Sequence, residues 1–414
     1  MHWNVSSLPQ QSAGKGKEET GCAVFLRHPV IKNVNTKKYR TRHEFHERIQ
    51  PKGIHYIIGL DAGYSSMKVF HETGYFCIPS FVKRITENQL TIQSPEDLLY
   101  RDGNGELYLI GKTAQNLVSS TDTNDTESEL FSRKRYSSQA FQILCNASLA
   151  LAMQKKRDNR SPVVQTGLPP AYLEADSQAM RRALCGTREF ELKVGLDPWK
   201  LWRLDFQPDQ IFLMPQPAGS LYSALIRSNG EYAPDARDLL YSNSLVLDIG
   251  FGTFDFYGLK SRAIVCRESI DDIGMREVLK ETSGKILEDL QEDIRVPALQ
   301  KCLERGTVEY VNEEQMEAGE KNLAPYLEQA SGDVFKKAME KARNVTNSFR
   351  EYKYLIVGGG TGEAWYAKIC DYLKGMKTLQ ILPSNRNDPT LPFLYSNVRG
   401  YYLYRYSMDK NNKR

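Results

Sequence analysis

Two short segments of this 414-residue chain share one pattern: an apolar strand that ends in an Asp-x-Gly turn, followed by a second strand. The segments are Tyr56–Phe70 and Ser244–Leu259. Aligning Asp61 with Asp248, a shift of 187 positions, also aligns glycine with glycine and one hydroxyl residue with another. A repeat at this distance indicates two related lobes, each with its own hairpin. The alternative is two ordinary buried hairpins, but these do not require an aspartate before both turns.

The turn chemistry favours phosphate binding. Glycine permits positive φ and close approach, and exposed N–H groups in such a turn form a concave anion site. Carboxylates beside a bound phosphate commonly hold Mg²⁺ through waters, so Asp61 and Asp248 are the candidate metal ligands. At the last aligned position the first hairpin has a lysine for phosphate charge, and the second has an aspartate for the metal side. The candidate binding residues are Asp61, Gly63, Ser65, Ser66 and Lys68 in the first hairpin, and Asp248, Gly250, Gly252, Thr253 and Asp255 in the second.

A third segment, Tyr354–Glu363, is an apolar strand that runs into consecutive glycines. Three residues without Cβ atoms let a flat ring or a phosphate lie directly on the backbone. Strands followed by glycines are common in α/β proteins, so this signal is weak by itself. After two phosphate hairpins it becomes a candidate nucleotide contact, formed by Gly358, Gly359, Gly360 and Thr361.

The order of two phosphate hairpins and a triple-glycine loop resembles the ATPase superfamily of actin, the sugar kinases and the seventy-kilodalton heat-shock chaperones. Three further segments are similar to bacterial and archaeal actin-like proteins of the ParM type, namely Val163–Tyr172, Pro215–Ala224 and Asn397–Tyr402. The resemblance runs from about Ile54 to Tyr406 and does not include the first fifty residues.

This resemblance implies a two-lobed α/β fold in which each lobe is a mixed sheet with flanking helices, a duplicated RNase H-like arrangement with two inserted subdomains. We expect the first lobe to comprise residues 54–237 and 397–414, with an insert over about 86–132. We expect the second lobe to comprise residues 238–396, with a charged helical insert over about 276–347.

The resemblance also implies hydrolysis of ATP, or of GTP, with Mg²⁺ in the cleft between the lobes. In the family, the residue at the place of Gln216 orients the attacking water, and here Gln216 and Asp248 would position and polarise it. In ParM-type relatives the nucleotide state drives assembly of filaments that push plasmids apart. We therefore expect a self-associating ATPase of the cytoskeletal kind, with a DNA-bound adaptor as partner and a role in plasmid or other DNA segregation.

Three other functions remain open at this point. A chaperone-type ATPase would carry a substrate-binding domain after the second lobe. A small-molecule kinase would need polar substrate-binding residues in the first lobe, where no such group is evident. A nucleotide-binding scaffold without hydrolysis would not need Asp61, Lys68, Gln216 and Asp248 together.

Composition limits the remaining possibilities. No run of about 18 apolar residues is present, so we expect no membrane span. Seven scattered cysteines without a CxxC pair favour a reducing cytoplasm. Residues 1–55 carry ten Lys or Arg and only four Asp or Glu, in a chain whose net charge is +4. We expect residues 1–53 to be a basic, flexible extension that nucleotide binding does not need, and direct contact with nucleic acid only through it.

Overall fold

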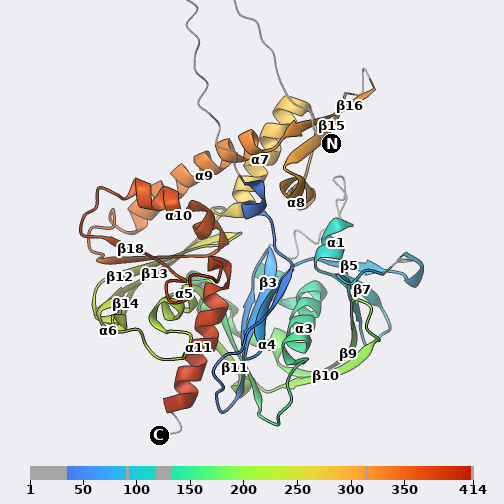
Figure 1. The fold of residues 1–414 in the computed structure, drawn as a ribbon, viewed down its shortest axis with the longest axis horizontal. Coiled ribbons are helices and arrows are strands. Elements are labelled where there is room, and N and C mark those ends of the chain that lie inside the picture. Colours follow the sequence, from blue (N-terminus) through green and yellow to red (C-terminus); the bar gives the residue numbers. More distant parts are fainter. Residues whose placement is uncertain (1–34, 90–92, 118–132, 313–315, 412–414) are drawn as a thin grey trace, which may run out of the picture. The chain divides into compact units, whose positions relative to one another are not determined.

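The structure, a computed structural model, describes residues 35–89, 93–117, 133–312 and 316–411 (Figure 1). Within them the chain forms a six-stranded sheet, two five-stranded sheets and a two-stranded hairpin. Two of these sheets carry the predicted phosphate hairpins. We name the first lobe after the sheet β1-β4-β3-β2-β8-β11 and the second lobe after the sheet β14-β13-β12-β17-β18.

The central sheet of the first lobe combines an antiparallel meander, β4-β3-β2, with two parallel strands, β8 and β11. Strand β2 is buried along its whole length, as its continuous apolar sequence predicts. The strands are β1 (Glu44–Glu47), β2 (Tyr56–Ala62), β3 (Ser66–His71), β4 (Gly74–Pro79), β8 (Pro162–Leu168) and β11 (Ile211–Pro215).

The central sheet of the second lobe repeats this arrangement. Strands β14-β13-β12 form an antiparallel meander, and β17 and β18 continue it in parallel, in the same order as β4-β3-β2-β8-β11. The strands are β12 (Ser244–Ile249), β13 (Thr253–Lys260), β14 (Ala263–Asp271), β17 (Tyr354–Gly358) and β18 (Gln380–Pro383). The duplication predicted from the repeated hairpins is therefore confirmed at the level of whole sheets.

Two helices, α5 (Gln216–Leu225) and α11 (Ser396–Asn411), lie between the sheets and share an apolar cluster with both of them. The two helices approach closely because glycines lie at their crossing. A Cβ atom at Gly400 would come within 1.8 Å of the carbonyl oxygen of Gly219. This backbone-to-backbone packing fixes the start of α5, and with it the position of Gln216.

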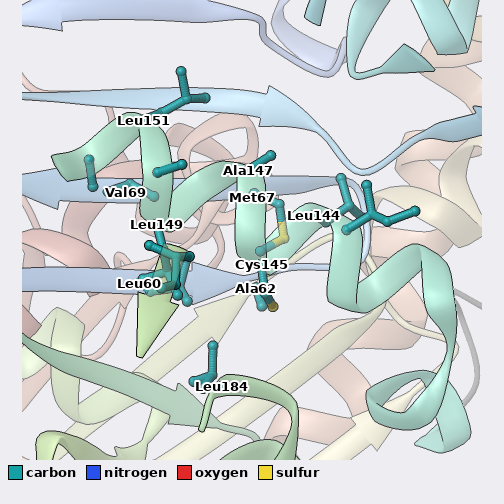
Figure 2. Close-up of a cluster of buried hydrophobic side chains, with 14 of the residues drawn as sticks. Leu60, Ala62, Met67, Val69, Leu144, Cys145, Ala147, Leu149, Leu151 and Leu184 are labelled. Atoms are coloured by element: carbon teal, nitrogen blue, oxygen red, sulfur yellow. The ribbon is translucent and has the colours of Figure 1, made fainter. Parts of the chain in front are cut away.

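Other helices cover the outer faces of the sheets. Helices α3 (Gln139–Met153) and α4 (Leu173–Leu184) pack on the first lobe, and Figure 2 shows apolar side chains of α3 against those of β2 and β3. The hydroxyl of Ser138 caps α3 by accepting a hydrogen bond from the Phe141 N–H. On the second lobe, α7 (Met275–Leu290), α9 (Ala324–Val345) and α10 (Gly360–Tyr372) contribute to one apolar core.

Each lobe carries additional structure. In the first lobe a small sheet, β10-β9-β6-β7-β5, consists of β5 (Val82–Ile85), β6 (Leu98–Arg101), β7 (Leu107–Ile110), β9 (Gly186–Val194) and β10 (Lys200–Phe206). The predicted insert over about 86–132 covers only part of this sheet, because β9 and β10 join it from far along the chain. Residues 90–92 and 118–132 of that prediction lie outside the described residues.

The segment predicted as a charged helical insert, about 276–347, contains α7, α8 (Val296–Arg305) and α9. It also contains a hairpin that the helical prediction missed, formed by β15 (Thr307–Asn312) and β16 (Glu317–Asn322). The remaining short elements are η1 (Thr36–Tyr39), η2 (Glu87–Gln89), α1 (Lys112–Asn116), η3 (Arg133–Ser137), η4 (Pro170–Tyr172), η5 (Pro208–Gln210), α6 (Ala236–Tyr241) and η6 (Phe393–Tyr395). None of the described helices is long and apolar enough to cross a membrane.

Part of the predicted flexible extension is integrated into the fold. Residues 35–53 include η1, which contacts α8 and α10, and β1, which pairs with β4 at the edge of the first sheet. The prediction of a flexible extension up to residue 53 is therefore wrong for this part. Its basic composition suggested a solvated segment, but backbone pairing and specific side-chain contacts hold it. Residues 1–34 lie outside the described part of the chain.

Candidate functional site

A cavity lies where the two predicted phosphate hairpins meet, and it contains about 720 Å³ of empty space, open solvent included. Most of the predicted site residues line it, namely Asp61, Ser65, Ser66, Lys68, Gln216, Asp248, Gly250, Gly359, Gly360 and Thr361. The chain thus brings together residues from both lobes and from the helix between them.

The two hairpin turns have the same local geometry. In the first, the N–H of Gly63 donates to the carbonyl oxygen of Ser66 at 3.1 Å. In the second, the N–H of Gly250 donates to the carbonyl oxygen of Thr253 at 2.9 Å. These pairs are the ones that the sequence alignment matched, so the repeat extends to individual hydrogen bonds.

The strand register confirms the same equivalence. Asp61 lies directly opposite Lys68 across β2 and β3. Asp248 lies directly opposite Asp255 across β12 and β13. Each hairpin therefore has an aspartate at the equivalent position of its first strand. The residue opposite it on the second strand differs, lysine in one hairpin and aspartate in the other.

In the first lobe Asp61 is held by two donors. The Lys68 ammonium donates to Oδ2 at 3.1 Å, and Nε2 of Gln216 donates to Oδ1 at 3.1 Å. Asp61 is itself almost fully buried. Because an amide both donates and accepts, Gln216 retains its Oε1 as an acceptor for a further hydrogen-bond donor in the cavity.

In the second lobe Asp248 is held by Asn397, the second residue of α11. Nδ2 of Asn397 donates to Oδ2 of Asp248 at 2.7 Å, and Ser220 on α5 donates to Oδ1 of Asn397 at 2.7 Å. Burial raises the pKa of Asp248 to about 6, and the nearby carboxylate of Asp61 raises it as well, although the Asn397 hydrogen bond opposes this. A carboxylate with a pKa near neutrality is suited to accepting a proton.

The glycine-rich loop after β17 lies against the second hairpin. Gly359 has a φ of +81°, and a Cβ atom there would come within 2.6 Å of the Asp248 carboxylate. The hydroxyl of Thr361 donates to the carbonyl oxygen of Gly250 at 2.6 Å. The loop therefore forms one wall of the cavity and leaves room for the aspartate.

Five of the predicted binding residues do not line the cavity. Asp255 is only 1% exposed, and its pKa is raised well above the ordinary value, first by burial and then by Asp248. Thr253 donates its hydroxyl to that carboxyl group at 3.1 Å. The two side chains therefore support the second hairpin from inside and do not line the cavity. The remaining three residues are Gly63, Gly252 and Gly358, which leave room for side chains of Lys68, Tyr64 and Ser220 respectively.

Other residues line the cavity that the sequence did not single out as site residues. They are Lys38, Tyr39, Arg40, Thr41, Arg42, Phe251, Met275, Glu363, Leu394 and Asn397. Phe251 and Glu363 adjoin predicted motifs and could have been included on that basis. Asn397 lies in a segment that the resemblance had marked, but only as a connecting helix. Nothing in the sequence pattern places residues 38–42 at the cavity.

The acidic residues suit Mg²⁺ that is bound together with a phosphate ligand. In the described part of the chain, no group of three or more His, Cys, Asp or Glu residues is arranged to hold a metal by itself. Mg²⁺ usually takes one or two carboxylates and completes its shell with waters and phosphate oxygens. Asp61 and Asp248, which line one cavity from two hairpins, match that partial ligand set.

Comparison with known proteins agrees with this architecture. Residues 59–219 match the family model of the N-terminal domain of actin-like proteins. A non-polymerisable quadruple mutant of pCBH ParM matches with a TM-score of 0.65 and 19% identity, over 84% of this chain and 98% of that one. A 15-stranded ParM filament from Clostridium botulinum matches with a TM-score of 0.62 and 18% identity, over 86% and 99% of the two chains.

The actin-like protein Alp7A also matches, with a TM-score of 0.61 and 14% identity, over 86% of this chain and 97% of that one. A search of curated proteins found no match. At these identities the structural likeness establishes the fold. The chain therefore has the two-lobed actin-like fold that ParM also has, and its residues 59–219 are similar to the N-terminal domain of actin-like proteins.

Proposed function

We propose that this protein is an actin-like nucleoside triphosphatase whose nucleotide state controls its assembly into cytoskeletal filaments. The observation that carries the proposal is the pair of equivalent hairpins, one from each lobe, that present Asp61 and Asp248 to one cavity beside a glycine-rich loop. The ligand would be ATP or GTP with Mg²⁺. Its phosphates would lie between the two turns and its nucleoside against Gly359–Thr361.

The residues of the cavity suit phosphoryl transfer to water. Such a reaction spreads negative charge over the phosphoryl oxygens, so catalysis depends on positioning and electrostatics. Lys68 and the N–H groups of the hairpin turns would stabilise that charge. Mg²⁺ held near Asp61 and Asp248 would neutralise charge on the phosphate oxygens.

Gln216 and Asp248 are suited to orient the attacking water. Gln216 donates to Asp61 through Nε2, which leaves its Oε1 to accept a hydrogen bond from the water. Asp248, with a pKa of about 6, would be ionised in most molecules at neutral pH and could accept the second hydrogen bond. Both side chains are fixed by other residues, so little reorganisation would be needed.

The two-lobed site links the nucleotide state to shape. A ligand that contacts both hairpins can set the angle between the lobes, as in other enzymes that close around a substrate. The ParM filament from Clostridium botulinum shares this fold, which supports assembly as the result. Exposed apolar side chains on both added subdomains, Leu196 and Leu201 in the first and Val311 in the second, suit contacts between copies of the chain.

The proposed cellular role follows from the same relatives. A head-to-tail contact that does not close on itself gives an open filament rather than a ring. We propose that such filaments act in plasmid or other DNA segregation through a DNA-bound adaptor protein. The six described cysteines form no disulfide, which supports the cytoplasm as the place of action.

The decisive experiment combines phosphate release with light scattering. Purified protein with Mg²⁺ and ATP, and separately with GTP, should scatter light above a critical concentration and then lose the signal as phosphate is released. A non-hydrolysable analogue should give the same rise without the later fall. Protein that stays monomeric at every concentration with both ATP and the analogue would contradict filament assembly, and absence of phosphate release would contradict the enzyme.

A further inference from the structure

The segment 35–43, which we call the strap, runs along the candidate nucleotide cavity and contacts both lobes. Its η1 turn contacts α8 and α10 in the second lobe, and it leads into β1 at the edge of the first lobe's sheet (Figure 1). Five consecutive strap residues, 38–42, line the cavity. The strap is therefore part of the site's wall, although its sequence shows no phosphate-binding motif.

On the second lobe the strap is anchored to α8. The hydroxyl of Thr36 donates to the carbonyl oxygen of Leu303 at 2.9 Å, and this bond is buried. The backbone N–H of Thr41 donates to Oε1 of Gln300 at 2.9 Å. These contacts fix the strap backbone at both ends of the turn.

On the first lobe the anchor is strand pairing. Glu44, at the start of β1, lies opposite Cys77 on β4, and the Cys77 thiol donates to the carbonyl oxygen of Arg42 at 3.4 Å. Cys77 in turn lies opposite Lys68 in the next pair of strands. The backbone of Arg42 is thus held at β4, the strand next to β3, which carries the predicted phosphate-binding lysine.

The strap supplies most of the positive charge around the cavity. Among the described residues that line it, four are cationic, and three of these are strap residues: Lys38, Arg40 and Arg42. The fourth, Lys68, is already paired with Asp61, and Arg40 is paired with Glu304. A nucleoside triphosphate brings several negative charges into such a cavity, so the cations that remain available matter most.

Arg42 and Lys38 are the two cations that remain available to a ligand. The Arg42 guanidinium lies 3.6 Å from Glu44 and 4.0 Å from Glu363, distances longer than those of good charge-assisted hydrogen bonds. Within the described part of the chain, Lys38 forms no salt bridge, and it is exposed. Both therefore have N–H groups free for a ligand in the cavity.

We propose that the strap is a third phosphate-binding element of this site, in which Arg42 and Lys38 contact the phosphate groups of the bound nucleotide. The inference rests on the proposed function, since it assumes a nucleotide in this cavity. It also reverses the expectation that nucleotide binding does not need the residues before position 54. A guanidinium can bind two phosphate oxygens at once, which makes Arg42 the stronger contact.

The test measures binding of Mg·ATP, Mg·ADP and AMP by calorimetry to the full chain, its Arg42→Gln and Lys38→Gln variants and the double variant. Lys37→Gln is the matched control, because Lys37 lies in the same turn but does not line the cavity. We expect the double variant to bind Mg·ATP at least about tenfold more weakly than the wild type. The reason is that the charge-assisted hydrogen bonds from Arg42 and Lys38 to the phosphate oxygens are lost. AMP, with a single phosphate, should lose less, and the control should bind as the wild type does.

Melting of each variant without nucleotide separates a binding role from a structural one, and we expect unchanged melting temperatures. Unchanged Mg·ATP affinity in the double variant would overturn the proposal, and so would tighter binding, which would mean that the strap blocks the cavity. Failure of the proposed function looks different, because the wild-type chain itself would then bind none of the three nucleotides.

Discussion

At the scale of single residues, the site depends on two aspartates with contrasting surroundings. Asp61 is paired with a lysine, whereas Asp248 is held by the neutral amide of Asn397. Burial is the largest cause of the raised pKa of Asp248, about 6, and the Asn397 hydrogen bond and Lys68 offset it only in part. In the proposed function, this difference suits the first lobe to neutralising charge and the second to accepting a proton.

Replacing Asp248 by asparagine should abolish most hydrolysis while nucleotide binding persists. Asparagine keeps an oxygen that can accept the hydrogen bond from Asn397, but it removes the negative charge. Loss of one such group commonly costs about 10²–10³-fold in rate. Phosphate release under saturating Mg·ATP measures the effect, and calorimetry checks binding. A variant that releases phosphate at a near-normal rate would remove Asp248 from the mechanism.

The raised pKa of Asp248 also predicts how stability depends on pH. Between its ordinary value of 3.8 and about 6, the folded protein holds this proton more often than the unfolded chain does. The contribution of this group to the free energy of unfolding therefore falls as pH rises through that window, by up to about 3 kcal/mol. Asp248→Asn removes the ionisation and should remove this loss.

Melting without nucleotide at pH 4.5 and at pH 7 tests this dependence. The melting temperature of Asp248→Asn relative to the wild type should be clearly higher at pH 7 than at pH 4.5. A difference that stays the same at the two pH values would show that Asp248 does not titrate in this range.

At the scale of elements, the position of the site depends on helices α5 and α11, which pack together between the two sheets. Gln216 opens α5 and Asn397 lies in the first turn of α11, so each helix delivers one side chain to one aspartate. Their close approach at Gly219 and Gly400 brings both helix starts to the same cavity. The two hairpins supply the two aspartates. The helices supply the amide side chains that hold these aspartates by hydrogen bonds.

Gly400→Ala should destabilise the protein strongly, because the new Cβ would overlap the Gly219 carbonyl of α5. Overpacking of this kind costs about 1–3 kcal/mol, and more where backbone must move. Gly332→Ala in α9 is the matched control, since a Cβ there meets no atom within 4 Å. Alanine in an open helical position should be neutral or stabilising by about 0.5–1 kcal/mol. Thermal melting compares the two, and equal melting temperatures would contradict close packing of α5 against α11.

At the scale of the whole molecule, a ligand in the cavity would contact both lobes, the intervening helix and the strap. The same residues that bind phosphate would therefore hold the lobes together. Subunit contacts would lie farther out, on the added subdomains, where apolar side chains are exposed. Nucleotide state and assembly would then be coupled through the lobe angle rather than through shared residues.

Nucleotide should stabilise the folded chain in a Mg²⁺-dependent manner. A ligand that binds only the folded state at about 100 times its Kd adds about 2.7 kcal/mol. The melting temperature should rise with Mg·ATP concentration, and EDTA should reverse most of the rise because the carboxylates then repel the phosphates. The same stabilisation with and without EDTA would mean that Asp61 and Asp248 do not hold Mg²⁺.

The substitution Leu201→Lys or Val311→Lys should block assembly without abolishing nucleotide binding. Both side chains are more than half exposed, on strands of the two added subdomains. Val265→Lys is the control, because Val265 is a similarly exposed side chain on the second lobe's central sheet. Sedimentation with Mg²⁺ and a non-hydrolysable analogue compares the three. Filaments that form equally well in all three variants would place the subunit contacts elsewhere.

The amino-acid sequence by itself determined the parts of this protein that are local. Each hairpin is specified by a buried strand, an Asp-x-Gly turn and a second strand, all within about fifteen residues. For this reason the equivalence of Asp61 with Asp248 and the duplicated sheets could be predicted from one repeat. The start of α5 at Gln216 was equally predictable, because a strand, a proline and a helical pattern follow one another directly.

Only the tertiary structure decided the contacts between distant segments. Asn397 reaches Asp248 across 149 positions, strands β9 and β10 complete a sheet begun near residue 82, and the strap enters the cavity from residues that a basic composition assigned to solvent. Local sequence patterns indicate which face of a helix or strand is buried. They do not indicate which other segment of the chain covers that face. A single sequence therefore predicted the two equivalent hairpins, whereas packing of the lobes decided which other side chains surround them.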